Sequence, residues 1–144
     1  MFTNIYAETW QIRLNMIPTD IPDEGDTMTY SRTFTNEDVQ QFADLSKDEG
    51  YHHMVGNEEG QVVLHGLPTA TMPTKLGGDI NYIARTMEFE FPHPAYTGTE
   101  ITCETTIERV EERDGRTELG ASCVCETADG TIVLRGHTEG IVMG

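Results

Sequence analysis

The sequence predicts an α+β fold, an antiparallel β-sheet wrapped around a central α-helix. Three observations predict it. Four segments between residues 86 and 142 are rich in β-branched and aromatic residues. Asp-Gly pairs at 114–115 and 129–130 separate the last three segments, and glycine in such pairs allows the tight turns of hairpins. Upstream, residues 66–78 form an apolar stretch of helical length.

The chain has 144 residues, enough for one domain with a core and too few for two. Residues 1–24 contain Trp10 and Pro18 but no clear hydrophobic period. We therefore expect an N-terminal arm, residues 1–24, packed on one domain that spans residues 25–144.

The domain is predicted to begin with a strand and a short helix. Residues 27–34 are rich in β-forming residue types. Thr35 then follows as a helix N-cap, with acidic residues in the first turn, where the helix dipole favours them. Apolar residues recur on one helical face, at Val39, Phe42 and Ala43. The helix should end between residues 46 and 50, and a loop should follow it.

The central helix is predicted from His65 or Gly66 to the glycine pair at residues 77–78. Pro68 suits its first turn, because the missing N–H would have no partner there. Pro73 should kink the helix, at a cost of about 3 kcal/mol unless packing compensates.

The segments after this helix are predicted to form an antiparallel meander. They span residues 86–91, 100–110, 116–127 and 131–142. The three cysteines, Cys103, Cys123 and Cys125, fall in them, and Cys123 and Cys125 would lie on the same face of one strand. This placement favours packing over a disulfide, and no CxxC or HxxxH spacing supports a zinc site. We expect no metal.

The composition excludes several classes of partner. The chain has 25 acidic and 9 basic residues, a net charge of −16, and its only lysines are Lys47 and Lys75. Nucleic acid is a poor partner, because its phosphates require Lys or Arg. Such an acidic surface is typical of a halophilic protein, since concentrated salt screens the self-repulsion. The N-terminus has no secretion signal and no apolar run reaches about 20 residues, so we expect a cytoplasmic protein away from the membrane.

The stretch "ADLSKDEGYHHMVG", residues 43–56, contains the strongest candidate site. Asp48 precedes His53 by five residues in a predicted loop, where a carboxylate and an imidazole can converge on one water. Both are also ordinary loop residues. His52 is a rival to His53, since neighbouring side chains of an extended segment face opposite sides and only one could face the site. Gly66, at the start of the central helix, could offer its N–H to an oxyanion.

The remaining candidates have plainer interpretations. His65 fits the role of a helix cap or a packed residue better than that of a base. We interpret His93 as a rim or turn residue and His137 as a structural residue. Lys75 and Arg85 could bind a phosphate or neutralise nearby carboxylates.

Four segments together resemble a known family: "FTNEDVQQFADLSKDEGYHH", "VLHGLPTATMPTKLGG", "MEFEFPHPAYTGTEITCETTIERVEE" and "DGTIVLRGHTEGIV". They are similar, over about residues 25–142, to the MaoC-like (R)-specific enoyl-CoA hydratases and dehydratases of the hot dog fold. The acidic composition suggests a haloarchaeal type. The resemblance implies reversible addition of water to a 2-enoyl thioester of coenzyme A or acyl carrier protein, giving an (R)-3-hydroxyacyl thioester, as in fatty acid metabolism. It implies no further cofactor, and a homodimer or higher homo-oligomer.

The resemblance also implies roles for individual residues. Asp48 and His53 would hold and activate the water, and the Gly66 N–H would bind the thioester oxygen. Substrate contacts are expected from the neighbouring residues Tyr51, His52, His65 and Leu67.

This chain departs from the family pattern at three points. Gly50 and Tyr51 stand where the family usually has Asn and Pro, and His52 replaces a residue that is usually apolar. The third departure is a short segment between His53 and His65.

Two alternatives use the same fold differently. A hot dog thioesterase would use the helix-end oxyanion site with Asp79 or Asp48 activating water toward the carbonyl carbon. An acyl-CoA binding module would perform neither reaction.

Overall fold

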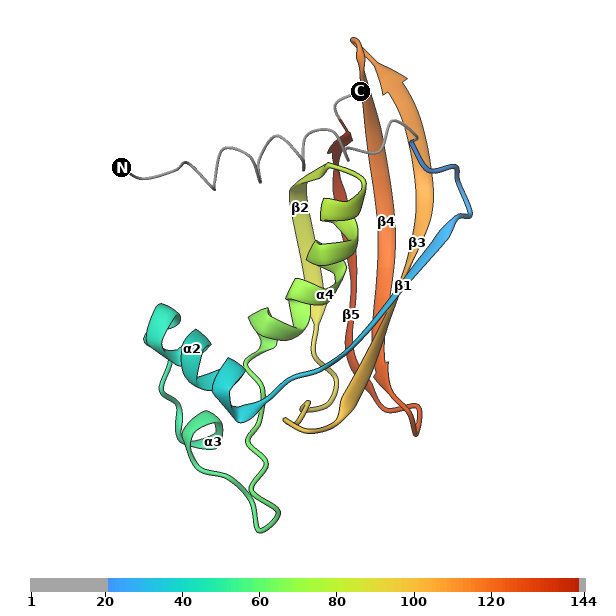
Figure 1. Ribbon diagram of the computed structural model, residues 1–144. Coiled ribbons are helices and arrows are strands. Elements are labelled where there is room, and N and C mark those ends of the chain that lie inside the picture. Colours follow the sequence, from blue (N-terminus) through green and yellow to red (C-terminus); the bar gives the residue numbers. More distant parts are fainter. Residues whose placement is uncertain (1–20, 143–144) are drawn as a thin grey trace, which may run out of the picture.

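One five-stranded antiparallel sheet forms the body of the computed structural model, which describes residues 21–142 (Figure 1). Its strands are β1 (Thr27–Thr33), β2 (Tyr82–Glu90), β3 (Glu100–Arg113), β4 (Arg116–Thr127) and β5 (Ile132–Val142). Their order across the sheet is β1-β3-β4-β5-β2. Most of the predicted N-terminal arm, up to residue 20, lies outside the described residues.

The two predicted hairpins are confirmed. Asp114 and Gly115 both have positive φ, 51° and 78°, and join β3 to β4. Gly130 (φ 85°) lies in the turn that joins β4 to β5. Both turns need the left-handed backbone region that glycine adopts without strain.

The predicted four-stranded meander is wrong in one respect, because β2 pairs with β5 at the far edge and not with β3. Residues 91–99 connect β2 to β3 and contain Pro92 and Pro94. Proline cannot donate to a strand ladder, so no tight hairpin forms there and the chain crosses to the other side of the sheet. The strand predicted at residues 86–91 also begins earlier, at Tyr82.

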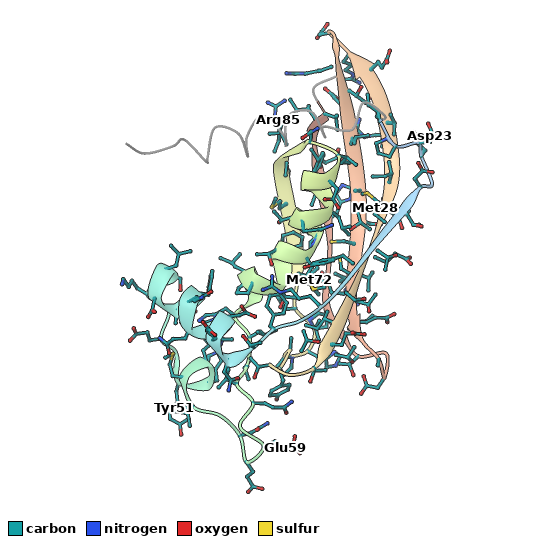
Figure 2. All side chains as sticks on the ribbon, viewed as in Figure 1. Asp23, Met28, Tyr51, Glu59, Met72 and Arg85 are labelled. Carbon is teal, nitrogen blue, oxygen red and sulfur yellow. The ribbon has the colours of Figure 1, made fainter. Side chains whose placement is uncertain are left out.

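The central helix, α4 (Gly66–Asp79), lies along one face of the sheet (Figure 1). Met72, labelled in Figure 2, is completely buried between α4 and the strands, and Leu76 is nearly so. The helix continues through Pro73 and ends one residue later than predicted. The Thr74 hydroxyl donates to the Ala70 carbonyl at 2.9 Å, next to the proline. Within residues 21–142 no helix is long and apolar enough to cross a membrane.

The helix α2 (Asn36–Ser46) begins at its predicted N-cap. The Asp38 N–H donates to Thr35 Oγ1 at 3.1 Å, and the Thr35 N–H donates to the Asp38 carboxylate at 2.8 Å. This capping box lowers the pKa of Asp38, chiefly through the backbone hydrogen bond from Thr35. Lys47 (φ 65°) ends the helix, so Asp48 begins the following loop.

A short helical turn, α3 (Tyr51–Met54), replaces the predicted extended segment. The Val55 N–H closes it by donating to the Tyr51 carbonyl at 2.9 Å. Consecutive side chains in a helical turn point about 100° apart rather than to opposite sides. The side chains of His52 and His53 can therefore lie near the same space.

The cysteines belong to the core, as predicted. All three are buried and unbridged, and Cys103 lies directly opposite Cys125 in the β3–β4 ladder. Burial raises the pKa of Cys123 to about 12, so its thiol is protonated at neutral pH. Because all three side chains are buried, none is accessible as a thiolate nucleophile.

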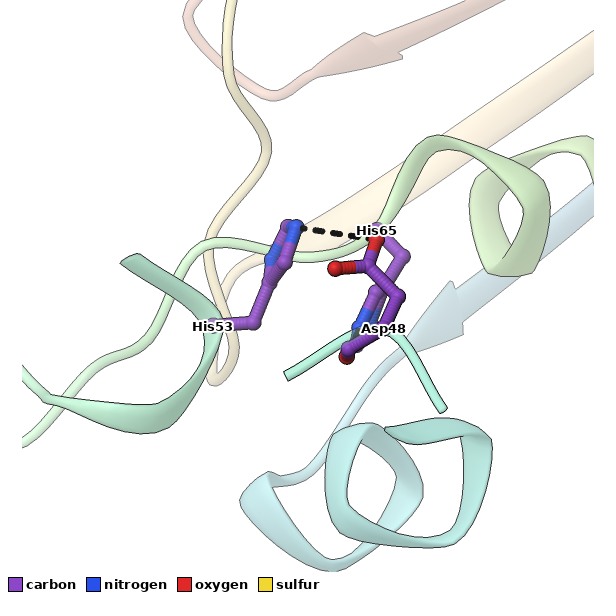
Figure 3. A group of neighbouring side chains, drawn as sticks. All are labelled: Asp48, His53 and His65. Carbon is purple, nitrogen blue, oxygen red and sulfur yellow. Dashed lines mark hydrogen bonds and ion pairs between the residues drawn. The ribbon is translucent and has the colours of Figure 1, made fainter. Parts of the chain in front are cut away.

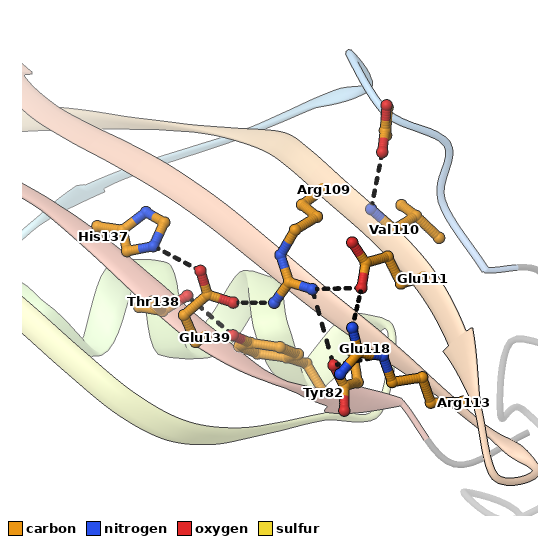
Figure 4. A network of polar contacts seen from close by, with 10 residues as sticks. Tyr82, Arg109, Val110, Glu111, Arg113, Glu118, His137, Thr138 and Glu139 are labelled. Carbon is orange, nitrogen blue, oxygen red and sulfur yellow. Dashed lines mark hydrogen bonds and ion pairs between the residues drawn. The ribbon is translucent and has the colours of Figure 1, made fainter.

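A charged network lies on the sheet face that is turned away from α4 (Figure 4). Arg109 contacts three carboxylates, from Glu111, Glu118 and Glu139. A side chain at position 120 would enter the space of the Glu139 carboxylate, which explains a glycine in mid-strand. The hydrogen bond from Arg109 lowers the pKa of Glu139. The predicted structural role of His137 fits this place, because its Nε2 lies 2.9 Å from Glu139 Oε1.

Candidate active site

The loop after α2, the turn α3 and the first turn of α4 meet at one end of the molecule (Figure 1), and Figure 3 shows the side chains there. Asp48, His53 and His65 come together there, and one ligand-type atom from each lies within 4.8 Å of the others. The structure thus brings together the two predicted water-activating residues and the residue before Gly66.

His53 is 7% exposed, and a backbone hydrogen bond fixes its ring. Its Nδ1 lies 2.6 Å from the Val63 carbonyl oxygen. A carbonyl oxygen can only accept, so Nδ1 carries the proton of this hydrogen bond. Nε2 is left facing the site, 3.9 Å from Asp48 Oδ2. One water molecule can hydrogen-bond both atoms across such a separation.

Asp48 approaches from the solvent side, with 55% of its side chain exposed. Its Oδ1 accepts the Gly50 N–H at 3.1 Å, and its own N–H donates to Ser46 Oγ at 3.1 Å. One carboxylate oxygen therefore holds the loop, and the other is the one that lies toward His53.

His65 is packed, as predicted, but its side chain does not cap α4. Its ring stacks on His53 with centroids 3.8 Å apart and planes at 18°, and the Phe42 ring contacts it in an edge-to-face arrangement at 4.7 Å. His65 Nε2 lies 2.9 Å from the Asp48 carbonyl oxygen. His65 thus contacts both members of the pair.

Gly66 begins α4, and its N–H makes no turn, loop or cap hydrogen bond to backbone within residues 21–142. Pro68 has no N–H, so Gly66 and Leu67 supply the free donors of the first turn. A Cβ at position 66 would lie 2.9 Å from Cζ of Phe91. Glycine therefore leaves room between this helix end and the Phe91 ring.

A cleft of about 560 Å³ opens at this helix end. Gly66, Leu67, His52 and His53 line it together with Phe91 and His93. Both histidines of the pair therefore face the cleft, and the expectation that only one could do so is wrong, because α3 is helical. His93 has the predicted rim position.

Asp48, Tyr51 and His65 do not line this cleft. Tyr51 is 77% exposed and lies on the outer side of α3 (Figure 2). His65 stacks on the His53 ring, and the Asp48 carboxylate lies 3.9 Å from Nε2 of His53. Substrate contacts of Tyr51 and His65 stay predictions.

The Val63 carbonyl and the Phe42 and Phe91 rings are parts of the site that sequence analysis missed. A backbone carbonyl has no sequence signal. Phe91 carries a weak one, since it ends a predicted strand just before two prolines.

Asp48, His53 and His65 could in principle offer a metal three ligand atoms. The stacked rings oppose this use, because the in-plane nitrogen lone pairs of nearly parallel rings run side by side and do not converge. His65 Nε2 is also engaged by the Asp48 carbonyl. The arrangement suits proton transfer better than coordination, and the absence of a metal stays a prediction.

A second cavity, of about 230 Å³, lies between α4 and the sheet. Pro73, Thr74 and Gly77 line it from α4, and Met87 and Phe89 line it from β2. The lining is mostly apolar. Phe89 lies two residues before Phe91 of the cleft, so the two spaces follow each other along α4 and β2.

No family model and no curated protein matches the sequence. Solved structures do match the fold. The (R)-hydratase from A. caviae involved in PHA biosynthesis has a TM-score of 0.75 at 19% identity, covering 88% of this chain and 100% of that chain. The MaoC-like dehydratase from Rhodospirillum rubrum has a TM-score of 0.71 at 19% identity, covering 85% and 93%.

A 3R-hydroxyacyl-ACP dehydratase complex from Mycobacterium tuberculosis has a TM-score of 0.64 at 18% identity, covering 84% of this chain and 98% of that chain. At such identities the likeness concerns the fold. Together with the helix and sheet described above, it confirms that the chain has the hot dog fold.

Proposed function

We propose that this chain is an (R)-specific hydratase and dehydratase that adds water to 2-enoyl thioesters of coenzyme A or acyl carrier protein. The observation that carries the proposal is the 3.9 Å separation between His53 Nε2 and Asp48 Oδ2 beside the free N-terminus of α4. An acid/base pair and an oxyanion donor are the two requirements of conjugate water addition.

In the hydration direction, Asp48 accepts a proton from the water as the water oxygen bonds to C3 of the enoyl group. The electron pair of the C2–C3 double bond moves toward the thioester carbonyl, whose oxygen accepts the Gly66 N–H. Protonated His53 Nε2 gives its proton to C2. Asp48 then returns the water proton to His53, so both groups regain their starting states and no co-reactant is needed. Dehydration reverses these steps.

The apolar cavity between α4 and the sheet is the proposed place of the acyl tail. It lies two to three helical turns from Gly66, on the same helix. Burial of each methylene there would contribute about 0.8 kcal/mol to binding. The thioester would remain in the cleft at the helix end.

Crotonyl-CoA is the test substrate, with enoyl absorbance and free thiol followed together in concentrated KCl. Loss of absorbance without thiol release is the expected result. Thiol release would instead indicate a thioesterase, and binding without turnover would indicate a binding module.

For the thioesterase alternative, the structure argues against Asp79, one of the two candidate carboxylates. Asp79 is the last residue of α4, about 20 Å from Gly66 at about 1.5 Å per residue. Asp79 is also ion-paired with Lys75 at 2.6 Å, the neutralising role considered for that lysine. Only Asp48 remains for a thioesterase.

We also propose a homodimer. β2 is an edge strand, and Ile83 and Met87 on it are about half exposed. Pairing of this edge with another chain would satisfy its free backbone groups and cover these side chains.

Salt should stabilise the protein, if the acidic surface reflects a halophilic source. Raising KCl from about 0.1 M to about 2 M shortens the Debye length from about 10 Å to below about 3 Å. Salt weakens the ion pairs of Arg109 as well, but the net charge of −16 makes repulsion the larger effect. We expect the thermal midpoint to rise by about 5 °C or more. A midpoint that falls or stays constant, measured by circular dichroism, contradicts the halophilic interpretation.

A further inference from the structure

We infer that His65 is a positioning residue that holds Asp48 at its working distance from His53. The inference rests on the proposed function where it is tested by kcat, because that measurement needs hydratase activity. It concerns a residue that does not line the cleft.

The hydrogen bond between His65 Nε2 and the Asp48 carbonyl is the first argument. The other hydrogen bonds found for residues 47–50 stay local. They run to Ala43, Ser46, Asp48 itself and His53. Among the described hydrogen bonds, the one from His65 alone ties this loop to the start of α4, where the oxyanion donor lies. Without it, the loop is anchored only to α2 and α3.

The position of the proton on His65 is the second argument. The Asp48 carbonyl accepts, so Nε2 of His65 is the donor. Nδ1 is buried and has no partner within the described structure. In the tautomer with the proton on Nε2, Nδ1 carries no hydrogen, which avoids burying an N–H without an acceptor. The site therefore selects the tautomer that binds the Asp48 backbone.

The stack on His53 is the third argument. His65 covers one face of the His53 ring at 3.8 Å, and His52 lies near its other side at 3.8 Å. The Val63 carbonyl already fixes the rotation of the His53 ring. Within residues 21–142, the bond from His65 is the one long-range hydrogen bond found for the exposed loop of Asp48, so the Asp48 side of the pair depends most on His65.

Two variants separate the donor from the ring. His65→Gln keeps an N–H donor at about the reach of Nε2 but loses the stack. His65→Phe keeps the stack but loses the donor. We expect His65→Phe to lower kcat by about tenfold to a hundredfold with KM within about twofold, because misplacement of a reacting group by about 1 Å costs about this much. His65→Gln should stay within about threefold of the unchanged protein.

The control is His137→Phe, which changes a histidine on the other face of the sheet and should leave kcat unchanged. Near-UV circular dichroism reports whether each variant is folded. A merely structural role predicts losses that follow the fraction folded. Equal kcat in His65→Phe and His65→Gln overturns the inference.

Amide hydrogen exchange tests the same point without turnover. The Gly50 N–H, which donates to Asp48 Oδ1, should exchange faster in His65→Phe and not in His65→Gln. If the unchanged protein lacks hydratase activity but this difference is seen, the proposed function fails and the positioning role stands. If exchange at Gly50 is the same in both variants, the positioning role fails whatever the activity.

Discussion

Replacing Asp48 by asparagine is expected to lower kcat for hydration of crotonyl-CoA by about 10³-fold. The carboxylate is the proposed acceptor of the water proton, and an amide cannot accept it. The side-chain oxygen of the introduced asparagine can still accept the Gly50 N–H, and the position is more than half exposed, so the loop should keep its shape. Initial rates of absorbance loss measure the effect.

Glu49→Gln is the matched control, because it removes the same charge from the next residue without touching the pair. His53→Ala should give a loss similar to that of Asp48→Asn, and His52→Ala a smaller one. A variant of His52 that is as inactive as His53→Ala would reverse the choice of histidine. Full activity in Asp48→Asn would end the proposed mechanism.

Replacing Gly66 by proline is expected to lower kcat by about 10²- to 10³-fold, because it deletes the proposed oxyanion donor. The backbone tolerates this change. The N–H at the first helical position has no helical partner, and proline is favoured there. His65, with φ −62° and ψ 151°, already has the extended conformation that a residue before proline prefers.

The Phe91 ring must be dealt with in this experiment, because it leaves no room for a side chain at position 66. We therefore compare Gly66→Pro with Gly66→Ala, each in a Phe91→Ala background. Both double variants have the enlarged space and a Cβ, and only the alanine keeps the N–H. Equal rates in the two would show that the Gly66 N–H does not hold the thioester oxygen.

Local signals in the sequence predicted much of this fold. Thr35 and Asp38 form a capping box within four residues, and each Asp-Gly pair forms its turn without distant help. The proximity of Asp48 and His53 was predictable because both lie in one short segment that directly follows the helix α2. Such features depend on neighbours in the chain, which the sequence displays directly.

The remaining features depend on tertiary contacts. The pairing of β2 with β5 is a choice between distant partners that the composition of residues 82–90 does not express. The anchoring of His53 needs the Val63 carbonyl, which any residue type would offer. The helical turn α3 contains only four residues, too few to show a hydrophobic period.

The contacts that build the site have a kinetic consequence, because they are short in sequence. His53 meets Val63 ten residues on, and His65 meets Asp48 across seventeen. Loops of such lengths close at low entropic cost, whereas the ladder between β1 and β3 joins residues more than 65 positions apart. We therefore expect the reactive groups to find one another early in refolding. The strands of the sheet would then pair after the contacts among Asp48, His53 and His65 have formed.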